Sequence, residues 1–358
     1  MFYNLIFPSI DFIAKINLFR YISFRTMSAL LTSLLLSFLL YPKFIKKFKY
    51  SQPIRGDGPS SHLEFKQGIP TMGGMIIIAS TVLSSLFWGD VSNQYLLLLI
   101  FLTLSYASLG FFDDFLKIRR QNSRGVIGTK KLIFQILFAF IFSYCVETLR
   151  HPSIAGHLTF PFFKNLTIQN SVLLISFTTL VIIGSSNAVN LTDGLDGLAT
   201  FPAMVVILCL GIISYCAGHF VFANYLNLTY VASAGELCIF CGAMIGACLG
   251  FLWYNAPPAM VFMGDTGSLA IGSALGGVSV IAKHEFVLAI LGGLFVIEAL
   301  SVIIQVSYFK LTGRRIFLMA PIHHHFEKKG WSESTIVIRF WIISFIFATI
   351  GLSTLKIR

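Results

Sequence analysis

The sequence predicts an all-α polytopic membrane protein that forms a single domain over residues 1–358. Of the 358 residues, 56% are hydrophobic and only 11% are charged, whereas about a quarter of the residues in a soluble domain are charged. The chain also contains 36 Phe residues, more bulk than a soluble core of this size could bury. About ten apolar segments are long enough to cross a hydrocarbon layer that is roughly 30 Å thick.

These apolar segments are expected to form about ten transmembrane helices, because about 20 apolar residues, or fewer with polar anchors, span the bilayer. The first segment should stay in the membrane, since the N-terminus lacks the basic region and cleavage site of a signal peptide. In chain order the segments cover residues 22–41, 71–88, 95–112, 132–146, 172–186, 200–217, 237–253, 267–282, 286–309 and 334–355.

Basic residues orient these segments in the membrane. Six Lys and Arg residues lie in 43–66, six in 117–131 and five in 310–329, which are alternate loops on one side. The loops and termini on the other side hold far fewer. By the positive-inside rule the basic loops are cytoplasmic, so both termini are expected to be periplasmic. Because these bases flank apolar segments and form no separate basic domain, nucleic acid is not an expected partner.

Five aspartates fall at segment ends on the predicted cytoplasmic face: Asp113, Asp114, Asp193, Asp196 and Asp265. The loop sequences around the last three contain no Lys or Arg. Carboxylates gathered there would repel one another unless a cation or bases from elsewhere joined them. A divalent cation is the simplest explanation, and oxygen ligands that work on phosphates favour Mg²⁺. The sequence therefore predicts an active site at the cytoplasmic face.

Residues 187–199 carry the densest polar pattern in the chain. Asp193 and Asp196 are three residues apart and share one face if the segment is helical, and Asn187 and Asn190 repeat that spacing. Neighbouring glycines let a ligand approach the backbone. A polar helix cap and turn would use the same residue types. Binding is favoured because the repeated Asp-Gly lies between two apolar segments.

The other acids have structural alternatives that the sequence leaves open. Asp113 and Asp114 are adjacent, so they diverge by about 100° on a helix. Lys117 is spaced to form an ion pair with either of them. Asp265 begins an apolar segment and could be an ordinary helix N-cap, although the N–H groups of a helix N-terminus also suit a phosphate.

Cationic side chains at the same face are candidates for phosphate binding. Lys66 precedes a Gly- and Pro-rich turn, and Lys130 and Lys131 precede an apolar segment, but each could also be an orientation charge. Histidines 323–325 are consecutive, so at most two can face one site on a helix. With no Cys nearby, phosphate binding is preferred to a soft-metal site. Their loop is expected to lie outside the packed bundle.

Three motifs are more specific than any single residue. They are Pro-Thr-Met-Gly-Gly at 70–74, Asn-Leu-Thr-Asp-Gly-Leu-Asp-Gly-Leu-Ala at 190–199 and Met-Ala-Pro-Ile-His-His-His-Phe-Glu-Lys-Lys-Gly-Trp at 319–331. In this order they resemble the polyprenyl-phosphate N-acetylhexosamine-1-phosphate transferase superfamily. The third motif is typical of its muramoyl-pentapeptide branch. The resemblance runs from about residue 53 to the C-terminus, with Ile69 standing where Thr is common.

The resemblance implies ten helices with both termini outside. It also implies catalytic roles for Asp113, Asp114 and Asp265, with Mg²⁺ bound by Asp265, and contacts to a uridine nucleotide or to phosphates. Asn187 and His323 join these contacts because they adjoin or lie within the matching motifs. The candidate substrate-binding residues are Lys66, Lys131, Asn187, Asn190, Leu191, Asp193, Asp196, Asn255, Phe262, His323, His324 and His325.

The reaction that the resemblance implies joins UDP-N-acetylmuramoyl-pentapeptide to undecaprenyl phosphate in the bacterial inner membrane. The products are lipid I and UMP, the first membrane step of peptidoglycan synthesis. Direct attack by the lipid phosphate and an aspartyl-phosphate intermediate both remain open. The family also implies a homodimer.

Two rival functions have weaker support. Glu298 lies midway through the apolar segment 286–309, and an intramembrane acid marks either a transport pathway or a buried partner. One such acid against five at the cytoplasmic face makes a transporter the weaker interpretation. The N-acetylglucosamine-phosphate branch of the superfamily is the closer alternative.

Overall fold

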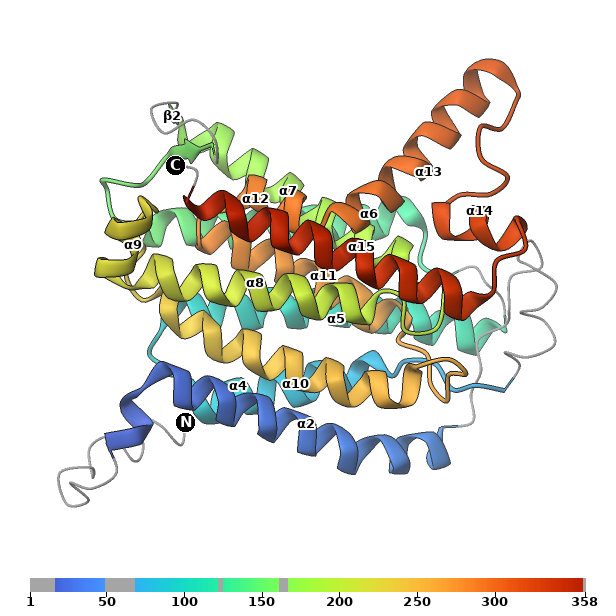
Figure 1. Ribbon diagram of the computed structural model, residues 1–358, viewed down its shortest axis with the longest axis horizontal. Coiled ribbons are helices and arrows are strands. Elements are labelled where there is room, and N and C mark those ends of the chain that lie inside the picture. The colour runs from blue at the N-terminus through green and yellow to red at the C-terminus, as the bar shows by residue number, and fades with distance from the viewer. Residues whose placement is uncertain (1–16, 49–67, 122–124, 161–166, 357–358) are drawn as a thin grey trace.

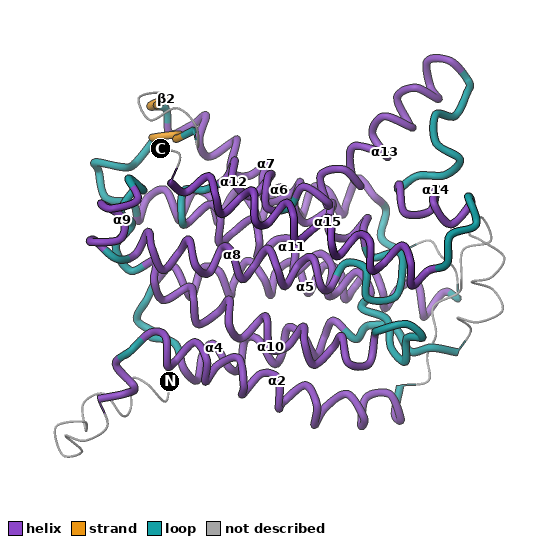
Figure 2. Tube along the Cα trace, viewed as in Figure 1, coloured by secondary structure: helices purple, strands orange, loops and turns teal. Residues whose placement is uncertain are grey.

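The computed structural model describes residues 17–48, 68–121, 125–160 and 167–356, which are almost entirely helical (Figure 1; Figure 2). The long helices lie side by side along the long axis, and loops and short helices close the two ends. The helices are η2 (Asn17–Arg20), α2 (Ile22–Lys47), α4 (Gly74–Trp88), α5 (Gln94–Arg120), α6 (Gly128–Leu149), α7 (Ser171–Thr192), α8 (Thr200–Gly218), α9 (Phe220–Leu226), η3 (Ala234–Glu236), α10 (Leu237–Asn255), α11 (Gly264–Ile281), α12 (Glu285–Leu291), α13 (Gly293–Thr312), α14 (Ile322–Lys328), α15 (Glu333–Ser353) and η4 (Thr354–Lys356).

Every one of the ten predicted apolar segments falls on helix. Within the described ranges, eight helices are long and apolar enough to cross a membrane, so the chain is a multi-pass membrane protein. The two segments that do not qualify are α4, which has 15 residues, and α11, which is rich in Gly and Ser. The predicted segment 286–309 is interrupted at Gly292, where α12 ends and α13 begins.

A short antiparallel β-sheet departs from the all-α prediction. Strands β1 (His157–Thr159) and β2 (Thr167–Gln169) pair in the connection between α6 and α7. Each strand has only three residues, so the sequence contains no alternating apolar and polar pattern long enough to predict a strand. The remaining described elements are helical, as expected.

Polar caps fix where several helices begin. The side chains of Asn93, Asn170 and Ser332 accept hydrogen bonds from backbone N–H groups three residues further on, at the starts of α5, α7 and α15. Each cap satisfies one of the N–H groups that the first helical turn leaves free. These helices therefore start where the apolar pattern meets a capping residue.

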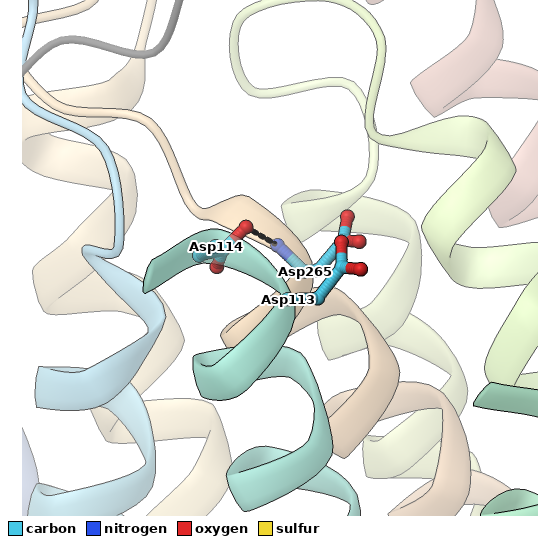
Figure 3. Close-up of side chains that lie close together, drawn as sticks. All are labelled: Asp113, Asp114 and Asp265. Carbon is cyan, nitrogen blue, oxygen red and sulfur yellow. Dashed lines mark hydrogen bonds between the residues drawn. The ribbon is translucent and has the colours of Figure 1, made fainter. Parts of the chain in front are cut away.

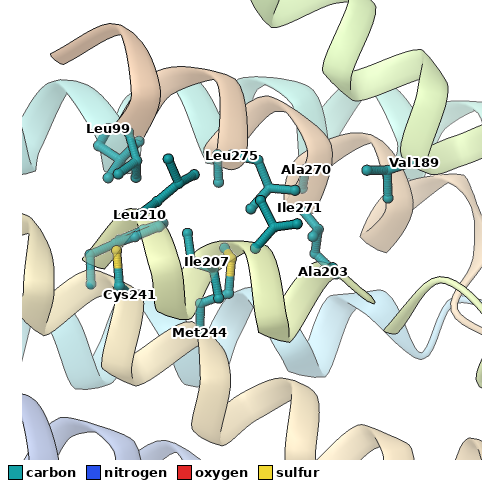
Figure 4. Close-up of a cluster of buried hydrophobic side chains, with 14 of the residues drawn as sticks. Leu99, Val189, Ala203, Ile207, Leu210, Cys241, Met244, Ala270, Ile271 and Leu275 are labelled. Atoms are coloured by element: carbon teal, nitrogen blue, oxygen red, sulfur yellow. The ribbon is translucent and has the colours of Figure 1, made fainter. Parts of the chain in front are cut away.

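Helix α11 lies in the middle of the bundle and packs against α5 and α7. Its residues from Thr266 to Ile281 are all buried, which explains its Gly- and Ser-rich sequence. A helix surrounded by protein needs small residues for close packing more than it needs lipid-like hydropathy. Figure 4 shows Ala270, Ile271 and Leu275 of α11 among buried side chains of the neighbouring helices.

The two ends of the bundle differ in character. The start of α2 and the end of α15 lie at the same end, on the left in Figure 1, whereas α14 lies at the other end. The β1–β2 connection shares the end with the termini. The C-terminal end of α5 and the N-terminal end of α11 lie toward the α14 end, which places the predicted site residues there.

Candidate active site

Three aspartates from two helices meet at the α14 end of the bundle. Asp113 and Asp114 lie near the C-terminal end of α5, and Asp265 lies in the first turn of α11. One carboxylate oxygen from each lies within 4.8 Å of the other two. The helices approach this closely because residue 110 is Gly, where a Cβ would collide with the backbone of Asp265. In Figure 3 the carboxylates of Asp113 and Asp265 lie together, and Asp114 faces the backbone of Asp265.

Asp114 is fully buried and caps the N-terminus of α11. Its Oδ1 accepts a hydrogen bond from the N–H of Asp265 at 3.1 Å. Its Oδ2 accepts from the N–H of Thr266 at 3.0 Å and from the Thr266 hydroxyl at 2.8 Å. A carboxylate in this place satisfies free N–H groups and interacts favourably with the helix dipole. The geometry therefore gives Asp114 the task of positioning Asp265.

Asp113 and Asp265 share two lysines. The Lys117 Nζ lies 2.6 Å from Asp113 Oδ2 and 3.0 Å from Asp265 Oδ2, and the Lys131 Nζ lies 2.7 Å from Asp265 Oδ2. Two ammonium groups beside the carboxylates favour their ionised forms. The bases that the sequence around Asp265 lacks thus come from α5 and α6. The side chains of Lys117, Lys131 and Asp265 are 13%, 16% and 18% exposed, so the cluster opens to the surface on this side.

The two asparagines at the end of α7 point to different partners. The Asn190 Nδ2 donates to Asp265 Oδ1 at 2.8 Å and to Ser268 Oγ at 2.8 Å, so Asn190 belongs to the acidic cluster. The Asn187 Nδ2 donates to Gln135 Oε1 at 2.9 Å, so Asn187 ties α7 to α6 one turn away. The structure brings Asn190 into the cluster and leaves Asn187 beside it.

Asp196 and Asn255 hold the Asp-Gly-Leu-Asp-Gly loop against the segment that follows α10. The Asp196 Oδ2 accepts from the N–H of Ala259 at 3.0 Å, and the Asn255 Oδ1 accepts from the N–H of Gly197 at 2.9 Å. Both side chains are buried, at 6% and 3% exposure. Their contacts here shape the loop, and direct nucleotide binding by these two residues stays a prediction.

Leu191, Asp193 and Phe262 are half-buried near the same loop. Asp193 follows the last residue of α7 as its C-cap. The backbone of Phe262 pairs with the first motif, since its N–H donates to the carbonyl of Pro70 at 2.9 Å and its carbonyl accepts from the N–H of Gly73 at 2.8 Å. The motif at 70–74 is therefore joined to the segment that leads into α11, whereas Lys66 lies outside the described residues.

The three histidines of α14 point in different directions, as their spacing predicts. His323 is fully buried, and its Nδ1 lies 3.1 Å from Glu298 Oε2. The Nδ1 of His324 lies 2.5 Å from Glu327 Oε2, and the Nδ1 of His325 accepts from a backbone N–H of its own loop. The prediction that this loop lies outside the packed bundle is wrong for His323, because α14 has an apolar face that packs on α15.

Two members of the cluster are not singled out by the sequence as binding groups. Lys117 has the spacing of an ordinary i,i+4 ion pair with Asp113, and only the crossing of α5 and α11 brings it to Asp265 as well. Ser268 carries no signal beyond its place one turn after Asp265. A base spaced four residues from a candidate catalytic acid is the one pattern that would have identified Lys117.

The helical membrane fold and the acidic cluster agree with a known class of transferase. The family model described as Glycosyl transferase family 4 matches residues 95–283, which include all three clustered aspartates. The class is thus that of glycosyl transferases, and this chain is a multi-pass membrane member of it.

Three curated relatives are named phospho-N-acetylmuramoyl-pentapeptide-transferase. The chain is 54% identical to the Pelagibacter ubique protein and 53% identical to that of Granulibacter bethesdensis, with both chains fully covered in each pair. It is 54% identical to the Dinoroseobacter shibae protein, with 96% of each chain covered. The chain belongs to the phospho-N-acetylmuramoyl-pentapeptide-transferase family, and it is an enzyme of peptidoglycan synthesis.

Proposed function

We propose that the enzyme takes phospho-N-acetylmuramoyl-pentapeptide from UDP-N-acetylmuramoyl-pentapeptide and transfers it to undecaprenyl phosphate, giving lipid I and UMP. The names of the relatives support the transferred group. The enzyme works in the bacterial inner membrane, with the acidic end of the bundle on the cytoplasmic side. The soluble nucleotide donor reaches the site there, and the acceptor lipid reaches it from the bilayer.

The observation that carries this proposal is the cluster of Asp113, Lys117, Lys131 and Asp265 at the end of α5 and α11. Both substrates are phosphate anions, so their reaction needs cationic groups that offset repulsion and stabilise the leaving UMP. Two lysines at a partly exposed edge supply such charges. The carboxylates hold both ammonium groups at fixed places before substrate arrives.

Asp265 is the main residue that would hold Mg²⁺, with Asp113 beside it. Carboxylate oxygens are the ligands that Mg²⁺ prefers, and Lys117 Nζ already shows that a cationic group fits between the two Oδ2 atoms. Asp114 is the poorer ligand because both of its oxygens accept hydrogen bonds from α11. When bound, Mg²⁺ would neutralise diphosphate charge and stabilise the leaving group.

The proposed chemistry is a direct attack by the lipid phosphate. One of its oxygens bonds to the phosphorus that carries the sugar, the bond from that phosphorus to the bridging oxygen breaks, and UMP leaves with that oxygen. A phosphate monoester is mostly ionised near pH 7, so no strong general base is needed. Asp113 acts by holding Lys117 at 2.6 Å, where the ammonium can turn to the incoming phosphate.

Release of UMP from purified enzyme in detergent or proteoliposomes tests this function. With undecaprenyl phosphate and Mg²⁺, UDP-N-acetylmuramoyl-pentapeptide should release UMP and UDP-N-acetylglucosamine should not. Omitting Mg²⁺ or introducing Asp265→Asn should abolish release, while Asp265→Asn protein keeps a normal unfolding temperature. Equal release from both donors would assign the enzyme to the N-acetylglucosamine branch. Uptake of intact donor without UMP would favour a transporter.

A further inference from the structure

Glu298 and His323 form a buried pair that the proposed chemistry does not use. Glu298 lies in the first half of α13 and His323 lies in the first turn of α14. Both side chains are 0% exposed, and His323 Nδ1 lies 3.1 Å from Glu298 Oε2. A carboxylate buried in an otherwise apolar stretch is costly unless it is paired and hydrogen-bonded. Where such a pair is kept, it can specify how elements sit relative to one another.

The pair lies beside a small second core in which four elements meet. This core joins the Asp-Gly-Leu-Asp-Gly loop to α13, α14 and α15, and it is separate from the main core around α11. A Cβ on Gly194, next to Asp193, would collide with His323 Nε2. The imidazole therefore lies directly against the loop backbone. The buried members of this core are Leu195, Leu198, Leu294, Ile336, Val337 and Phe340.

Within the described ranges, one hydrogen bond orients the His323 ring, the bond between Nδ1 and Glu298. Among the described residues, His323 Nε2 and Glu298 Oε1 have no hydrogen-bond partner, so the ring is fixed by its Nδ1 bond and by apolar packing. The ring nitrogen that faces Gly194 is Nε2. If Nδ1 carries the proton of the neutral ring and donates it to Glu298, Nε2 has no proton. Loss of the Glu298 acceptor would let the ring rotate and push on the loop.

We propose that Glu298 is a positioning residue for donor binding. By accepting the hydrogen bond from His323, it locks α14 against the loop that carries Asp193, and so sets where His324 and that loop meet the nucleotide donor. This inference rests on the proposed function, because it requires the donor to bind between these two elements. Glu298 itself touches no substrate, and the same contact explains why an acid lies in this membrane helix without a transport pathway.

The test compares steady-state UMP release by the full-length enzyme and its variants. Glu298→Ala should raise the KM for the nucleotide donor by about tenfold, with a smaller change in the KM for undecaprenyl phosphate. Glu298→Gln keeps the size of the side chain and one acceptor oxygen, so its donor KM should stay within about threefold of the parent value. Ser301→Ala is the matched control: Ser301 is buried on the same helix, and its hydroxyl bonds only to the Glu298 carbonyl among the contacts of the described chain.

A double-mutant cycle separates positioning from independent roles. Because Glu298 acts through His323, the double variant Glu298→Ala and His323→Ala should raise the donor KM no further than the more damaging single variant does. Losses that multiply, parent-like donor KM in Glu298→Ala, or equal damage by Glu298→Gln would each overturn the proposal. A general folding defect in Glu298→Ala would instead lower its unfolding temperature and its kcat and leave both KM values unchanged. If the parent enzyme released no UMP, that result would refute the proposed function and would leave the contact between Glu298 and His323 in place.

Discussion

Asp113 and Asp114 are adjacent in the chain, yet α5 turns their carboxylates in different directions. Successive residues on a helix diverge by about 100°, so the two acids meet different neighbours. Asp113 meets the two lysines and Asp265, whereas Asp114 meets the first N–H groups of α11. One acid can therefore serve chemistry while the other holds the scaffold in place.

This division of tasks predicts opposite effects for two substitutions. Asp114→Ala leaves buried N–H and hydroxyl donors at the start of α11 unpaired, at a cost of about 1–3 kcal/mol each. We expect a clearly lower unfolding temperature in detergent. Asp113→Asn keeps one acceptor oxygen and should unfold like the parent, while UMP release falls by about a hundredfold. A parent-like unfolding temperature in Asp114→Ala would contradict the capping role.

The sequence predicts most members of this cluster but not how they are connected. Asp113, Asp265, Asn190 and Lys131 stand in motifs or at segment ends, and the structure brings all four together. The capping contacts of Asp114 join residues 151 and 152 positions apart. Such contacts depend on how two helices cross, which no local spacing reveals.

Among the elements, α11 determines where the site lies. It starts beside the C-terminal end of α5 and runs through the centre of the bundle, so its first turn meets the acids of α5. Helix existence was predictable from apolar runs, because a backbone in lipid must satisfy its hydrogen bonds internally. The break at Gly292 was not, since the apolar pattern continues across it from α12 to α13.

Close approach of α5 and α11 predicts a contrast between two helical glycines. In Gly110→Ala the new Cβ meets the backbone of Asp265, which cannot move aside as a flexible side chain could. We expect a loss of about 1–3 kcal/mol in stability and much slower UMP release. Gly184 of α7 faces open space, so Gly184→Ala should be neutral or slightly stabilising. Similar activities in the two purified variants would argue against the close crossing.

At the scale of the whole molecule, charge and architecture agree. The C-terminal ends of α2, α5 and α13, which lead into the loops rich in Lys and Arg, lie at the end that carries the acidic cluster and α14, while the start of α2 and the end of α15 lie at the opposite end. An even number of helices running along the bundle would give this arrangement. Hydropathy alone does not identify every such helix, because burial inside the bundle lets α11 be less apolar than a lipid-facing helix.

Single-cysteine labelling in intact cells tests the orientation of the bundle. The experiment starts from a variant whose six native cysteines are replaced. Exposed positions Gln121 and Lys328 at the acidic end should resist a membrane-impermeant thiol reagent, and Gln169 at the end of β2 should react. Permeabilised cells should label all three. Labelling of position 121 or 328 from outside would place the proposed active site on the wrong side of the membrane.

The end opposite the acidic cluster is closed by a buried ionic network. The Arg150 Nη1 lies 2.8 Å from Glu147 Oε2, and its Nη2 donates to the carbonyl of Val280 at 2.6 Å and lies 3.9 Å from Glu285 Oε1. Lys283 lies beside them with only 3% exposure. These groups join the C-terminal ends of α6 and α11 to the start of α12.

Lys283 should make the stability of this end depend on pH. Burial and the nearby Arg150 charge lower the pKa of Lys283 from 10.5 to about 8, although Glu285 and Glu147 oppose the shift. The unfolded chain therefore holds a proton between about pH 8 and pH 10.5 that the folded chain has lost, so stability should rise with pH across this window. Neutral Lys283 still has two N–H groups for the carbonyls of Ile154 and His157, which its Nζ contacts at 2.9 and 2.6 Å.

The matched variant is Lys283→Met, which keeps the length of the side chain and removes the titrating group. The unfolding temperature of the parent, measured relative to Lys283→Met, should increase from pH 8 to pH 10 by an amount equivalent to about 2–3 kcal/mol. Below about pH 7 the difference should be constant, because both folded and unfolded forms of the parent are protonated there. UMP release should be unchanged in the variant at pH 7.5, since Lys283 lies at the opposite end from the acidic cluster. A difference that stays flat from pH 7 to pH 10, or that falls, would mean that Lys283 remains charged in the folded protein.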